Sequence, residues 1–211
     1  MHRSGIINKI IETKKFTKYL EIGVCYPHDC FDMVRCAQKD GVDPGYQNPS
    51  NPVNYKFTSD DFFSKLEQGL LDKSPDYKWD LIFIDGLHLS YQVEKDVLNS
   101  LNHLSEGGVI VLHDCDPFMY EDNYTRLVED YWRQAWNGTV WKAVYRLKAT
   151  RPDLNIATLQ ADEGVGLIKR GSQELVPFDN PYFEYRVFQK NRVRDLNLIP
   201  VEDLDIWLSN S

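Results

Sequence analysis

The residues that decide the fold run from Trp79 to Pro117 and read WDLIFIDGLHLSYQVEKDVLNSLNHLSEGGVIVLHDCDP. Two short apolar runs within them, Leu81–Ile84 and Val109–Leu112, are rich in Ile, Val and Leu and do not alternate with polar residues. Such runs are typical of strands that are buried on both faces, as in a parallel sheet. Between the runs, apolar residues recur at the three- and four-residue steps of an amphipathic helix, at Val93, Val97, Leu101 and Leu104. The stretch therefore predicts a strand, a helix and a second strand.

Polar clusters follow both predicted strands directly. Asp85 and His88 follow the first strand, and His113, Asp114 and Asp116 follow the second. In an open parallel sheet, ligands bind outside the carboxyl ends of the strands. Because both clusters fall at such ends, we expect a functional site there.

Length and composition predict one substantial core and disfavour two classes of partner. A chain of 211 residues with 42% hydrophobic residues can bury such a core. The net charge of −8 argues against a nucleic-acid binder, because neutralising phosphates requires concentrated Lys and Arg. The sequence shows no signal peptide and no apolar run of the roughly 20 residues that a bilayer requires. We therefore expect a cytoplasmic protein without a membrane span.

The four cysteines form no CxxC pair and are expected to be reduced packing thiols, at Cys25, Cys30, Cys36 and Cys115.

The residues before the central stretch predict a second strand–turn–helix unit. A buried strand is expected at residues 19–24 with a turn at Gly23, followed by a helix from about Asp29 to Gln38. A second short strand ends at Asp43, roughly 20 residues beyond the turn, where nucleotide-binding folds place an acid on the ribose hydroxyls. An N-terminal helix is predicted by one apolar face, which consists of Ile6, Ile7, Ile10 and Ile11.

Further elements complete a chain that alternates strands and helices. A third strand is expected at Val53–Phe57, and Thr58 begins a capped helix. The buried side of that helix is expected to carry Phe62, Phe63, Leu66 and Leu70. Beyond the central stretch, the pattern predicts two helices and a hairpin, at residues 124–136, 139–147, 154–159 and 165–168.

The predicted architecture is a doubly wound, Rossmann-like α/β sheet of seven strands. The sheet is expected to be mostly parallel and to close on a C-terminal antiparallel hairpin. We assign residues 1–171 to this domain, with the N-terminal helix included. Residues 172–211 form a mixed basic and aromatic tail that is expected to pack on the domain or to bind a partner.

The ordered set of these segments resembles the class I S-adenosylmethionine-dependent methyltransferases. The chain is most similar to the branch whose fourth strand ends in IDG-x-H and whose fifth ends in HD, which includes O-methyltransferases of small molecules and sugars. The similarity covers roughly residues 16–170 and implies S-adenosylmethionine as the cofactor. The segments that carry it are YLEIGV, GVDP, TSDDFF, FIDGLHLSYQVEKDV and LSEGGVIVLHDCDP.

The resemblance implies six cofactor-binding positions, which are Glu21, Gly23, Asp43, Ser59, Asp60 and Asp85. Gly23 would let the backbone approach the methionine moiety, because glycine has no side chain. Asp43 would accept hydrogen bonds from the ribose hydroxyls, and Ser59 and Asp60 match the positions that approach the adenine. Simpler roles for these residues stay open as well, namely an ordinary turn at Gly23, a solvated acid at Asp43 and helix capping at Ser59 and Asp60.

Candidate catalytic residues come from the two polar clusters. Methyl transfer to a hydroxyl requires a base, a metal ion or both, because the pKa of a hydroxyl lies far above neutral. His88 lies where the resembling metal-dependent O-methyltransferases carry their base, and an imidazole pKa of about 6.5 suits proton acceptance. Asp85, His113 and Asp114 offer side chains for Mg²⁺ or for positioning the acceptor. A helix cap at His88 and a turn at His113 are the alternatives.

Taken together, the sequence predicts an S-adenosylmethionine-dependent methyltransferase of the EC 2.1.1 type. The expected acceptor is a hydroxyl group of a sugar, of another glycan or of another small polar molecule, and not a nucleic acid. The alternative is a non-catalytic nucleotide- or cofactor-binding module of the same fold, since the loop after Gly23 lacks the second glycine usual in the family. A dinucleotide oxidoreductase is disfavoured because the G-x-G-x-x-G fingerprint is missing. Whether the chain forms a homo-oligomer stays open.

Overall fold

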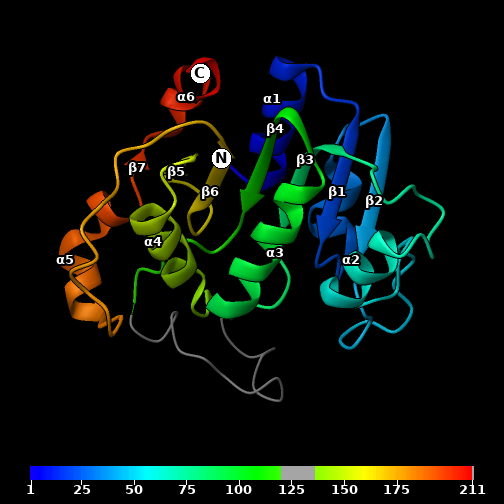
Figure 1. The fold of residues 1–211 in the computed structure, drawn as a ribbon, viewed down its shortest axis with the longest axis horizontal. Coiled ribbons are helices and arrows are strands. Elements are labelled where there is room, and N and C mark those ends of the chain that lie inside the picture. Colours follow the sequence, from blue (N-terminus) through cyan, green and yellow to red (C-terminus); the bar gives the residue numbers. More distant parts are fainter. Residues whose placement is uncertain (120–135, 211) are drawn as a thin grey trace. The chain divides into compact units, whose positions relative to one another are not determined.

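The computed structural model describes residues 1–119 and 136–210, and its strands form one hydrogen-bonded sheet (Figure 1). The order of the seven strands is β2-β1-β3-β4-β6-β5-β7. The chain divides into an N-terminal unit, residues 2–87 and 95–111, and a C-terminal unit, Met1 with residues 88–94 and 112–211. The predicted α/β class, a mostly parallel sheet with a C-terminal antiparallel hairpin, is confirmed.

Parallel strands form the centre of the N-terminal unit. β1 (Lys18–Ile22) pairs in parallel with β2 (Gln38–Val42) on one side and with β3 (Trp79–Ile84) on the other. All residues of β3 except Asp80 are buried, as expected for a strand that is covered on both faces. β4 (Leu104–Leu112) is longer than predicted. Only the apolar run Val109–Leu112 was predicted as a strand, because the residues before it are less apolar.

Two helices of the N-terminal unit follow the predicted patterns closely. α1 (Arg3–Lys14) buries its isoleucine face, and Asn8 fixes the helix by donating from Nδ2 to the carbonyl oxygen of Met33 at 2.9 Å. α2 (Ser59–Glu67) begins after Thr58, whose hydroxyl accepts a hydrogen bond from the Asp61 amide at 3.2 Å. This capping satisfies one of the free amides at the helix start and fixes where the helix begins.

Two predicted elements of this unit are wrong. The expected helix at residues 29–38 is replaced by two short 3₁₀ turns, η1 (Pro27–Asp29) and η2 (Phe31–Met33). Only Cys30 and Val34 are buried between residues 27 and 37, and one buried turn is too narrow an apolar face to stabilise a helix. Asp29, the expected start of the helix, is instead the last residue of η1.

The expected third strand at residues 53–57 is reduced to a single parallel bridge between Val42 and Tyr55. Pro52 has no amide to donate, and Tyr55 is the one buried residue between positions 52 and 57. Leu70 is also misplaced by the sequence pattern, since α2 ends before it and its side chain is 64% exposed.

α3 (Ser90–Asn102) contains the predicted helical stripe of the central stretch. Val93, Val97 and Leu101 are buried as expected. Leu104 was expected to extend the same stripe, but it is the first residue of β4. The apolar spacing typical of a helix therefore continues past the point where the helix ends.

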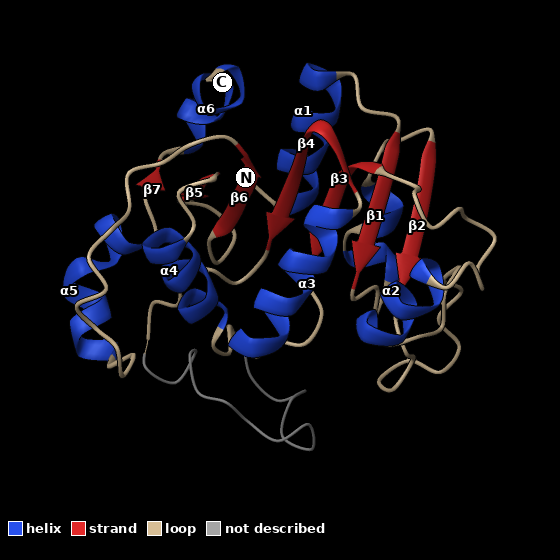
Figure 2. Cartoon of the chain, viewed as in Figure 1, coloured by secondary structure: helices blue, strands red, loops and turns tan. Residues whose placement is uncertain are grey.

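The C-terminal unit contains the predicted hairpin and an additional strand from the tail. β5 (Leu154–Leu159) and β6 (Val165–Arg170) pair antiparallel, and α4 (Val140–Thr150) precedes them. Figure 2 shows a long loop after β6 that leads to α5 (Tyr185–Asp195). The tail continues through β7 (Leu198–Ile199), η5 (Val201–Asp203) and α6 (Leu204–Ser209).

The sheet has the predicted number of seven strands only because β7 is present, since the predicted third strand does not form. It pairs in parallel with β5 through Thr158 and Leu159, although its own residues show no strand pattern. The division into a domain of residues 1–171 and a tail of residues 172–211 stays a prediction. The helix expected at residues 124–136 lies almost wholly outside the described residues, which omit positions 120–135.

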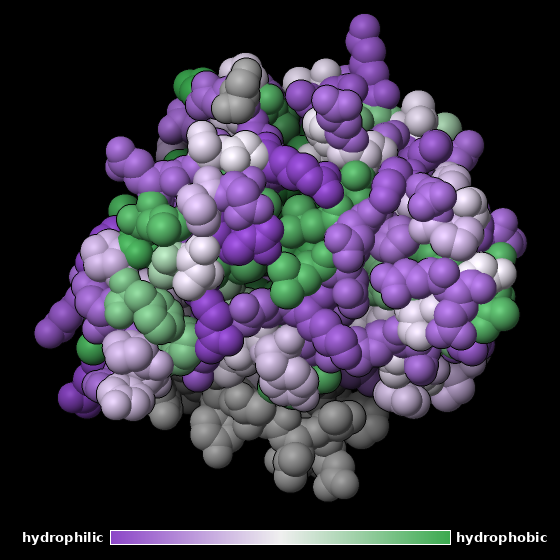
Figure 3. All heavy atoms as spheres, viewed as in Figure 1, coloured by the Kyte–Doolittle hydropathy of each residue, from purple (hydrophilic) through white to green (hydrophobic). Residues whose placement is uncertain are grey.

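Surface composition and cysteine state agree with the sequence. In Figure 3, hydrophilic side chains cover much of the visible face, and hydrophobic ones gather in patches that include the region of α4. All four cysteines are free thiols. Among the described residues, no helix combines the length and the apolarity needed to cross a membrane.

Candidate active site

The turn after β1 is closed around Gly23 in the N-terminal unit. Gly23 has a φ of +94°, and a Cβ atom added there would lie 2.2 Å from the carbonyl oxygen of Asp85. Its amide donates to the carbonyl oxygen of Val42 at 2.8 Å, and the Asp85 amide donates to that of Ile22 at 2.9 Å. The ends of β1, β2 and β3 are thus joined by main-chain contacts that no residue with a side chain could preserve.

Glu21 is buried near the end of β1, shortly before Gly23, and is held by a neighbouring tyrosine. The hydroxyl of Tyr19 donates a hydrogen bond to Glu21 Oε2. Burial raises the pKa of Glu21 to about 8, and the Tyr19 hydrogen bond opposes part of that rise. Asp85 raises the same pKa further, and Arg3 lowers it. Glu21 therefore keeps its proton to a higher pH than an exposed glutamate does.

Asp85 is paired with an arginine that the sequence did not single out. Arg3 Nε lies 3.5 Å from Asp85 Oδ2, and both side chains are largely buried. Arg3 stands on α1 at the spacing of the buried isoleucines that follow it, Ile6, Ile7 and Ile10. The sequence did contain a signal for Arg3, namely a cation on the apolar face of a helix. That position directs the guanidinium toward the core.

Asp43 lies at the end of β2 in a small network of loop hydrogen bonds. Its Oδ1 accepts a hydrogen bond from the Gly45 amide at 2.7 Å. Burial raises the pKa of Asp43, while hydrogen bonds from Gly45 and Asn51 lower it. Asn51 is completely buried and donates from Nδ2 to the carbonyl oxygen of Val24. Asp43 is thus a fixed carboxylate at a strand end, rather than a solvated one.

Ser59 and Asp60 occupy the first turn of α2, after the N-cap residue Thr58. Asp60 Oδ2 lies 2.6 Å from Lys95 Nζ, and both side chains are about half exposed. This ion pair engages the carboxylate that was expected near the adenine. The adenine role of Ser59 and Asp60 stays a prediction.

His88 is held by its own backbone and ring in the C-terminal unit. The carbonyl oxygen of His88 accepts from the Thr139 amide at 2.8 Å, and a Cβ atom on Gly138 would lie 2.2 Å from that oxygen. The ring stacks on Trp136 with centroids 5.1 Å apart and an angle of 26° between the planes. His88 Nδ1 lies 2.9 Å from the carbonyl oxygen of Trp136 and 3.3 Å from Asp114 Oδ2.

The contacts of His88 fix which ring nitrogen carries a proton. A carbonyl oxygen and a carboxylate oxygen can only accept, so Nδ1 must be the donor. In the neutral ring, Nε2 then carries the lone pair. The arrangement leaves His88 suited to accept a proton at Nε2.

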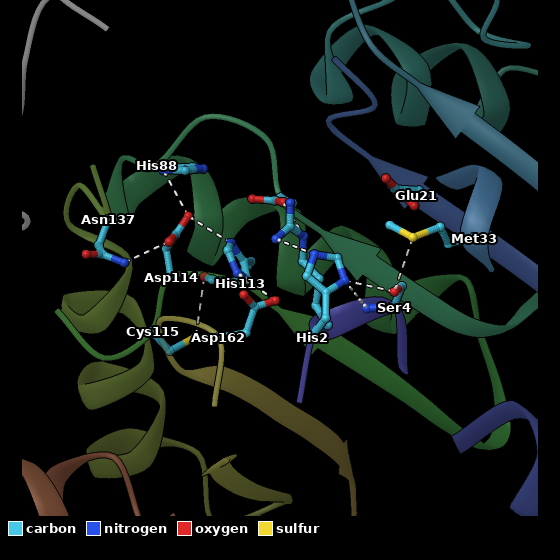
Figure 4. A network of polar contacts seen from close by, with 12 residues as sticks. His2, Ser4, Glu21, Met33, His88, His113, Asp114, Cys115, Asn137 and Asp162 are labelled. Atoms are coloured by element: carbon cyan, nitrogen blue, oxygen red, sulfur yellow. Dashed lines mark hydrogen bonds and ion pairs between the residues drawn. The ribbon is translucent and has the colours of Figure 1, made fainter. Parts of the chain in front are cut away.

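Asp114 connects the polar side chains of this unit (Figure 4). Its Oδ1 accepts from Asn137 Nδ2 at 2.7 Å, and its Oδ2 lies 3.0 Å from His113 Nδ1. Asp114 has a φ of +58°, which is uncommon for a residue with a side chain and costs about 1 kcal/mol or more. The local strain is maintained because three nitrogen donors converge on one carboxylate.

His113 continues the network to the hairpin loop. Its Nε2 lies 3.6 Å from Asp162 Oδ2, and its side chain is 9% exposed. Cys115 and Asp116 pair with the same loop through main-chain bonds to Gly164 and Glu163, at 3.0 and 2.9 Å. The predicted residues His88, His113 and Asp114 are therefore brought together, and Asn137 and Asp162 join them without having been predicted.

Asp116 does not belong to this network, although it was a candidate by position. It is 2% exposed and receives two hydrogen bonds from Arg192 of the tail helix α5, one of them Nε to Oδ1 at 2.9 Å. Burial raises the pKa of Asp116, and Arg192 lowers it. Its role is to join the tail to the segment after β4. The basic residues of the tail were the available signal, but they did not indicate which acid they meet.

Comparison with known proteins finds one matching family model and many structures of similar fold. Residues 20–115 match the family model described as a methyltransferase domain. No protein among the curated sequences matches the chain significantly. Among solved structures, the O-methyltransferase of Bacillus cereus in complex with SAH has 14% identity and a TM-score of 0.55, with 80% of each chain covered.

Two further structures have the same fold at similarly low identity. The O-methyltransferase TomG of Streptomyces achromogenes, in complex with SAM, has 12% identity and a TM-score of 0.52, with 81% of this chain and 80% of that chain covered. The SAH-bound methyltransferase PaMTH1 of Podospora anserina has 17% identity and a TM-score of 0.50, with coverage of 81% and 78%. At these identities the likeness establishes the fold.

Proposed function

The chain carries a methyltransferase domain of the class I fold, and from this premise we propose that it transfers the methyl group of S-adenosylmethionine to a hydroxyl group of a sugar or another small polar acceptor. The methyltransferase class predicted from the sequence is confirmed. The observation that best supports a hydroxyl as the methyl acceptor is the geometry of His88. Its Nδ1 lies 2.9 Å from the Trp136 carbonyl oxygen and 3.3 Å from Asp114 Oδ2, so that Nε2 can act as a base. A hydroxyl needs such a base, whereas a thiol or an amine needs it less.

The proposed chemistry is an in-line displacement assisted by His88. Nε2 of His88 would take the proton of the acceptor hydroxyl. S-adenosylmethionine, when bound, would supply the methyl group, and the electron pair of the cleaved carbon–sulfur bond would stay on its sulfur. Asp114 stabilises the imidazolium that forms, because its carboxylate lies 3.3 Å from Nδ1.

We assign the cofactor contacts to the N-terminal unit. Gly23 would allow the main chain to approach the methionine moiety, and Asp43 would accept hydrogen bonds from the ribose hydroxyls. Glu21 and Asp85 would receive the ammonium and sulfonium charges of the cofactor. The raised pKa of Glu21 supports this assignment, since strongly perturbed acids are common in binding sites and a bound cation would favour the ionised form.

A divalent cation such as Mg²⁺ is a separate proposal. Asp85, His113 and Asp114 supply the candidate donor set, and the ion would stabilise an acceptor oxyanion when bound. The donor set fits Mg²⁺ only in part, because Asp114 already accepts hydrogen bonds at both oxygens and one donor is a nitrogen. Dialysis against a chelator tests it: restoration of activity by Mg²⁺ supports the ion, and full activity after chelation overturns it.

The setting proposed for this reaction is the cytoplasm. Four free thiols, two of them buried, suit a reducing compartment. The acceptor is proposed to be a small molecule or a glycan.

The direct test is turnover with S-adenosylmethionine. The protein is incubated with the cofactor and a panel of sugars and phenols, and S-adenosylhomocysteine formation is measured beside the His88→Gln variant. Acceptor-dependent product with the native protein and a large loss in the variant would support the proposal. A protein that binds S-adenosylhomocysteine but whose His88→Gln variant turns over at the native rate would end the assignment of His88. A protein that binds neither cofactor form would favour the non-catalytic module.

A further inference from the structure

A cavity of about 300 Å³ lies within the C-terminal unit beside the pair of His113 and Asp162. Three segments of the chain line it: the residues after β4, the loop of the β5–β6 hairpin, and the tail from α5 to β7. Its lining includes four charged residues and two exposed apolar ones, namely Asp116, Asp162, Glu163 and Arg192, and Phe118 and Val193. The tail therefore forms one wall of this cavity.

The cavity walls are fixed before any ligand binds. Arg192 and Asp116 join the tail to the segment after β4 through two hydrogen bonds. The hairpin loop meets the same segment closely, since a Cβ atom on Gly164 would lie 2.5 Å from the Cβ of Asp116. A preformed cavity loses little conformational entropy when it binds a small molecule.

Apolar side chains at the cavity are exposed to water. Phe118 is 60% exposed and Val193 is 63% exposed. The guanidinium carbon of Arg192 lies 5.0 Å from the centroid of the Phe118 ring, which orients one face of the aromatic ring. Exposed apolar groups inside a concave polar rim favour a ligand with an apolar face of its own.

The charges at the cavity disfavour anions. The positive charge of Arg192 is compensated by Asp116, which it contacts with two nitrogens. Asp162 and Glu163 add two further carboxylates from the hairpin loop, and the side chain of Asp162 is 20% exposed. Carboxylates accept hydrogen bonds from hydroxyl and ammonium groups and repel phosphate and carboxylate groups.

We propose that this cavity is the acceptor subsite, and that it takes a hydroxylated ring that is uncharged or carries an amino group while excluding phosphorylated or carboxylated ones. This inference rests on the proposed function, because it supplies the acceptor for that reaction. The C-terminal tail then determines specificity through Val193 and Arg192, and Phe118 covers one face of the ring. Asp162 connects the subsite to His113 at 3.6 Å.

Saturation-transfer NMR on the full chain loaded with S-adenosylhomocysteine tests the subsite. The probes are glucosamine, methyl α-glucopyranoside and glucose 6-phosphate at equal concentration. We expect saturation of the first two probes and at least a fivefold weaker signal from the phosphorylated one. Phe118→Ala and Val193→Ser should each reduce the signals of the bound probes at least threefold. The control Leu175→Ala, an exposed apolar residue that lines another cavity, should leave them unchanged.

A charge variant and a cofactor titration complete the test. Glu163→Gln is expected to narrow the difference between glucosamine and glucose 6-phosphate. Strongest binding of the phosphorylated probe by the native protein, or equal signals in Phe118→Ala and the control, would overturn the subsite. Titration with S-adenosylhomocysteine is run on every variant. If the native protein binds S-adenosylhomocysteine but none of the probes, this inference alone is wrong. If the native protein does not bind S-adenosylhomocysteine, the proposed function is wrong.

Discussion

The turn around Gly23 and the network around Asp114 are built in opposite ways. The first is a main-chain structure, in which the ends of three strands approach so closely that a side chain at Gly23 has no room. The second is a side-chain structure, in which His88, His113 and Asn137 converge on one carboxylate from separate segments. A main-chain site depends on one glycine and a short motif, so it is visible in sequence. A side-chain site depends on tertiary packing, so substitutions of its residues should cause losses of different size.

The largest expected effect is that of Gly23→Ala. The added methyl group would meet the Asp85 carbonyl, and the φ of +94° is unfavourable for alanine. We expect destabilisation of at least about 2 kcal/mol and loss of measurable S-adenosylhomocysteine binding. Thermal unfolding and calorimetric titration measure the two effects.

Gly107→Ala is the matched control for that variant. Gly107 also has a positive φ, of +70°, but nothing lies within 4 Å of its added Cβ. It should lose roughly 1 kcal/mol of stability and keep its cofactor affinity. Equal behaviour of the two alanine variants would mean that backbone strain alone, and not the close approach, governs the Gly23 turn.

His88→Gln should affect turnover while leaving the cofactor site intact. Loss of a general base lowers kcat about 10²- to 10⁴-fold. The Kd for S-adenosylhomocysteine should change less than about twofold, since His88 is not among the residues assigned to the cofactor. His28→Gln, at a ring that is 75% exposed, is the control for removal of an imidazole. A parallel loss of cofactor binding in His88→Gln would contradict a role of His88 in proton transfer alone.

Asn137→Ala should produce a smaller, graded loss. It removes the 2.7 Å hydrogen bond to Asp114 Oδ1 but leaves the contacts of His113 and His88 with Oδ2. We expect kcat to fall roughly three- to tenfold and stability to fall by about 1 kcal/mol. Steady-state kinetics beside the exposed-site control Asn102→Ala measure the change. A loss as large as that of His88→Gln would mean that Asn137 itself takes part in the chemistry.

A pH dependence of stability is also expected, and it belongs to the main-chain site. Burial raises the pKa of Glu21 from 4.5 to about 8, so the folded protein holds a proton that the unfolded chain has released between these values. Stability should therefore fall as pH rises across this window, by at most about 1.4 kcal/mol per pH unit from this group. Glu21→Gln should flatten the profile of urea unfolding between pH 5 and pH 8, which is roughly the same window. An unchanged slope in the variant would assign the pH dependence to other groups.

The same contrast explains what the sequence could predict. The apolar runs of β1, β3 and β4, the isoleucine face of α1 and the hairpin each depend on local periodicity, and all were found. Gly23 and Asp43 lie at the strand ends where the sequence predicts them, and their roles in cofactor binding stay predictions. The helix predicted at residues 29–38 does not form, because too few residues of this segment are buried to stabilise it.

The residues that were missed depend on contacts distant in sequence. Asn137 and Asp162 lie in a turn and a hairpin loop, where polar residues are ordinary, and nothing local distinguishes them. β7 is two residues long and exists because it pairs with β5. The basic character of the tail was noted, but Asp116, the partner of its Arg192, is 76 positions away. Pairings of this kind follow from the fold and not from spacing.

Calorimetric titration with S-adenosylhomocysteine, on the native protein and on Asp43→Asn, tests the central claim most directly. Asp32→Asn serves as an exposed control, and NAD is added as a competitor. The account predicts a Kd on the order of micromolar, unaffected by NAD and by Asp32→Asn, and weakened at least about tenfold in Asp43→Asn. No heat of binding at millimolar ligand, or equal affinity of the native and Asp43→Asn proteins, would contradict it.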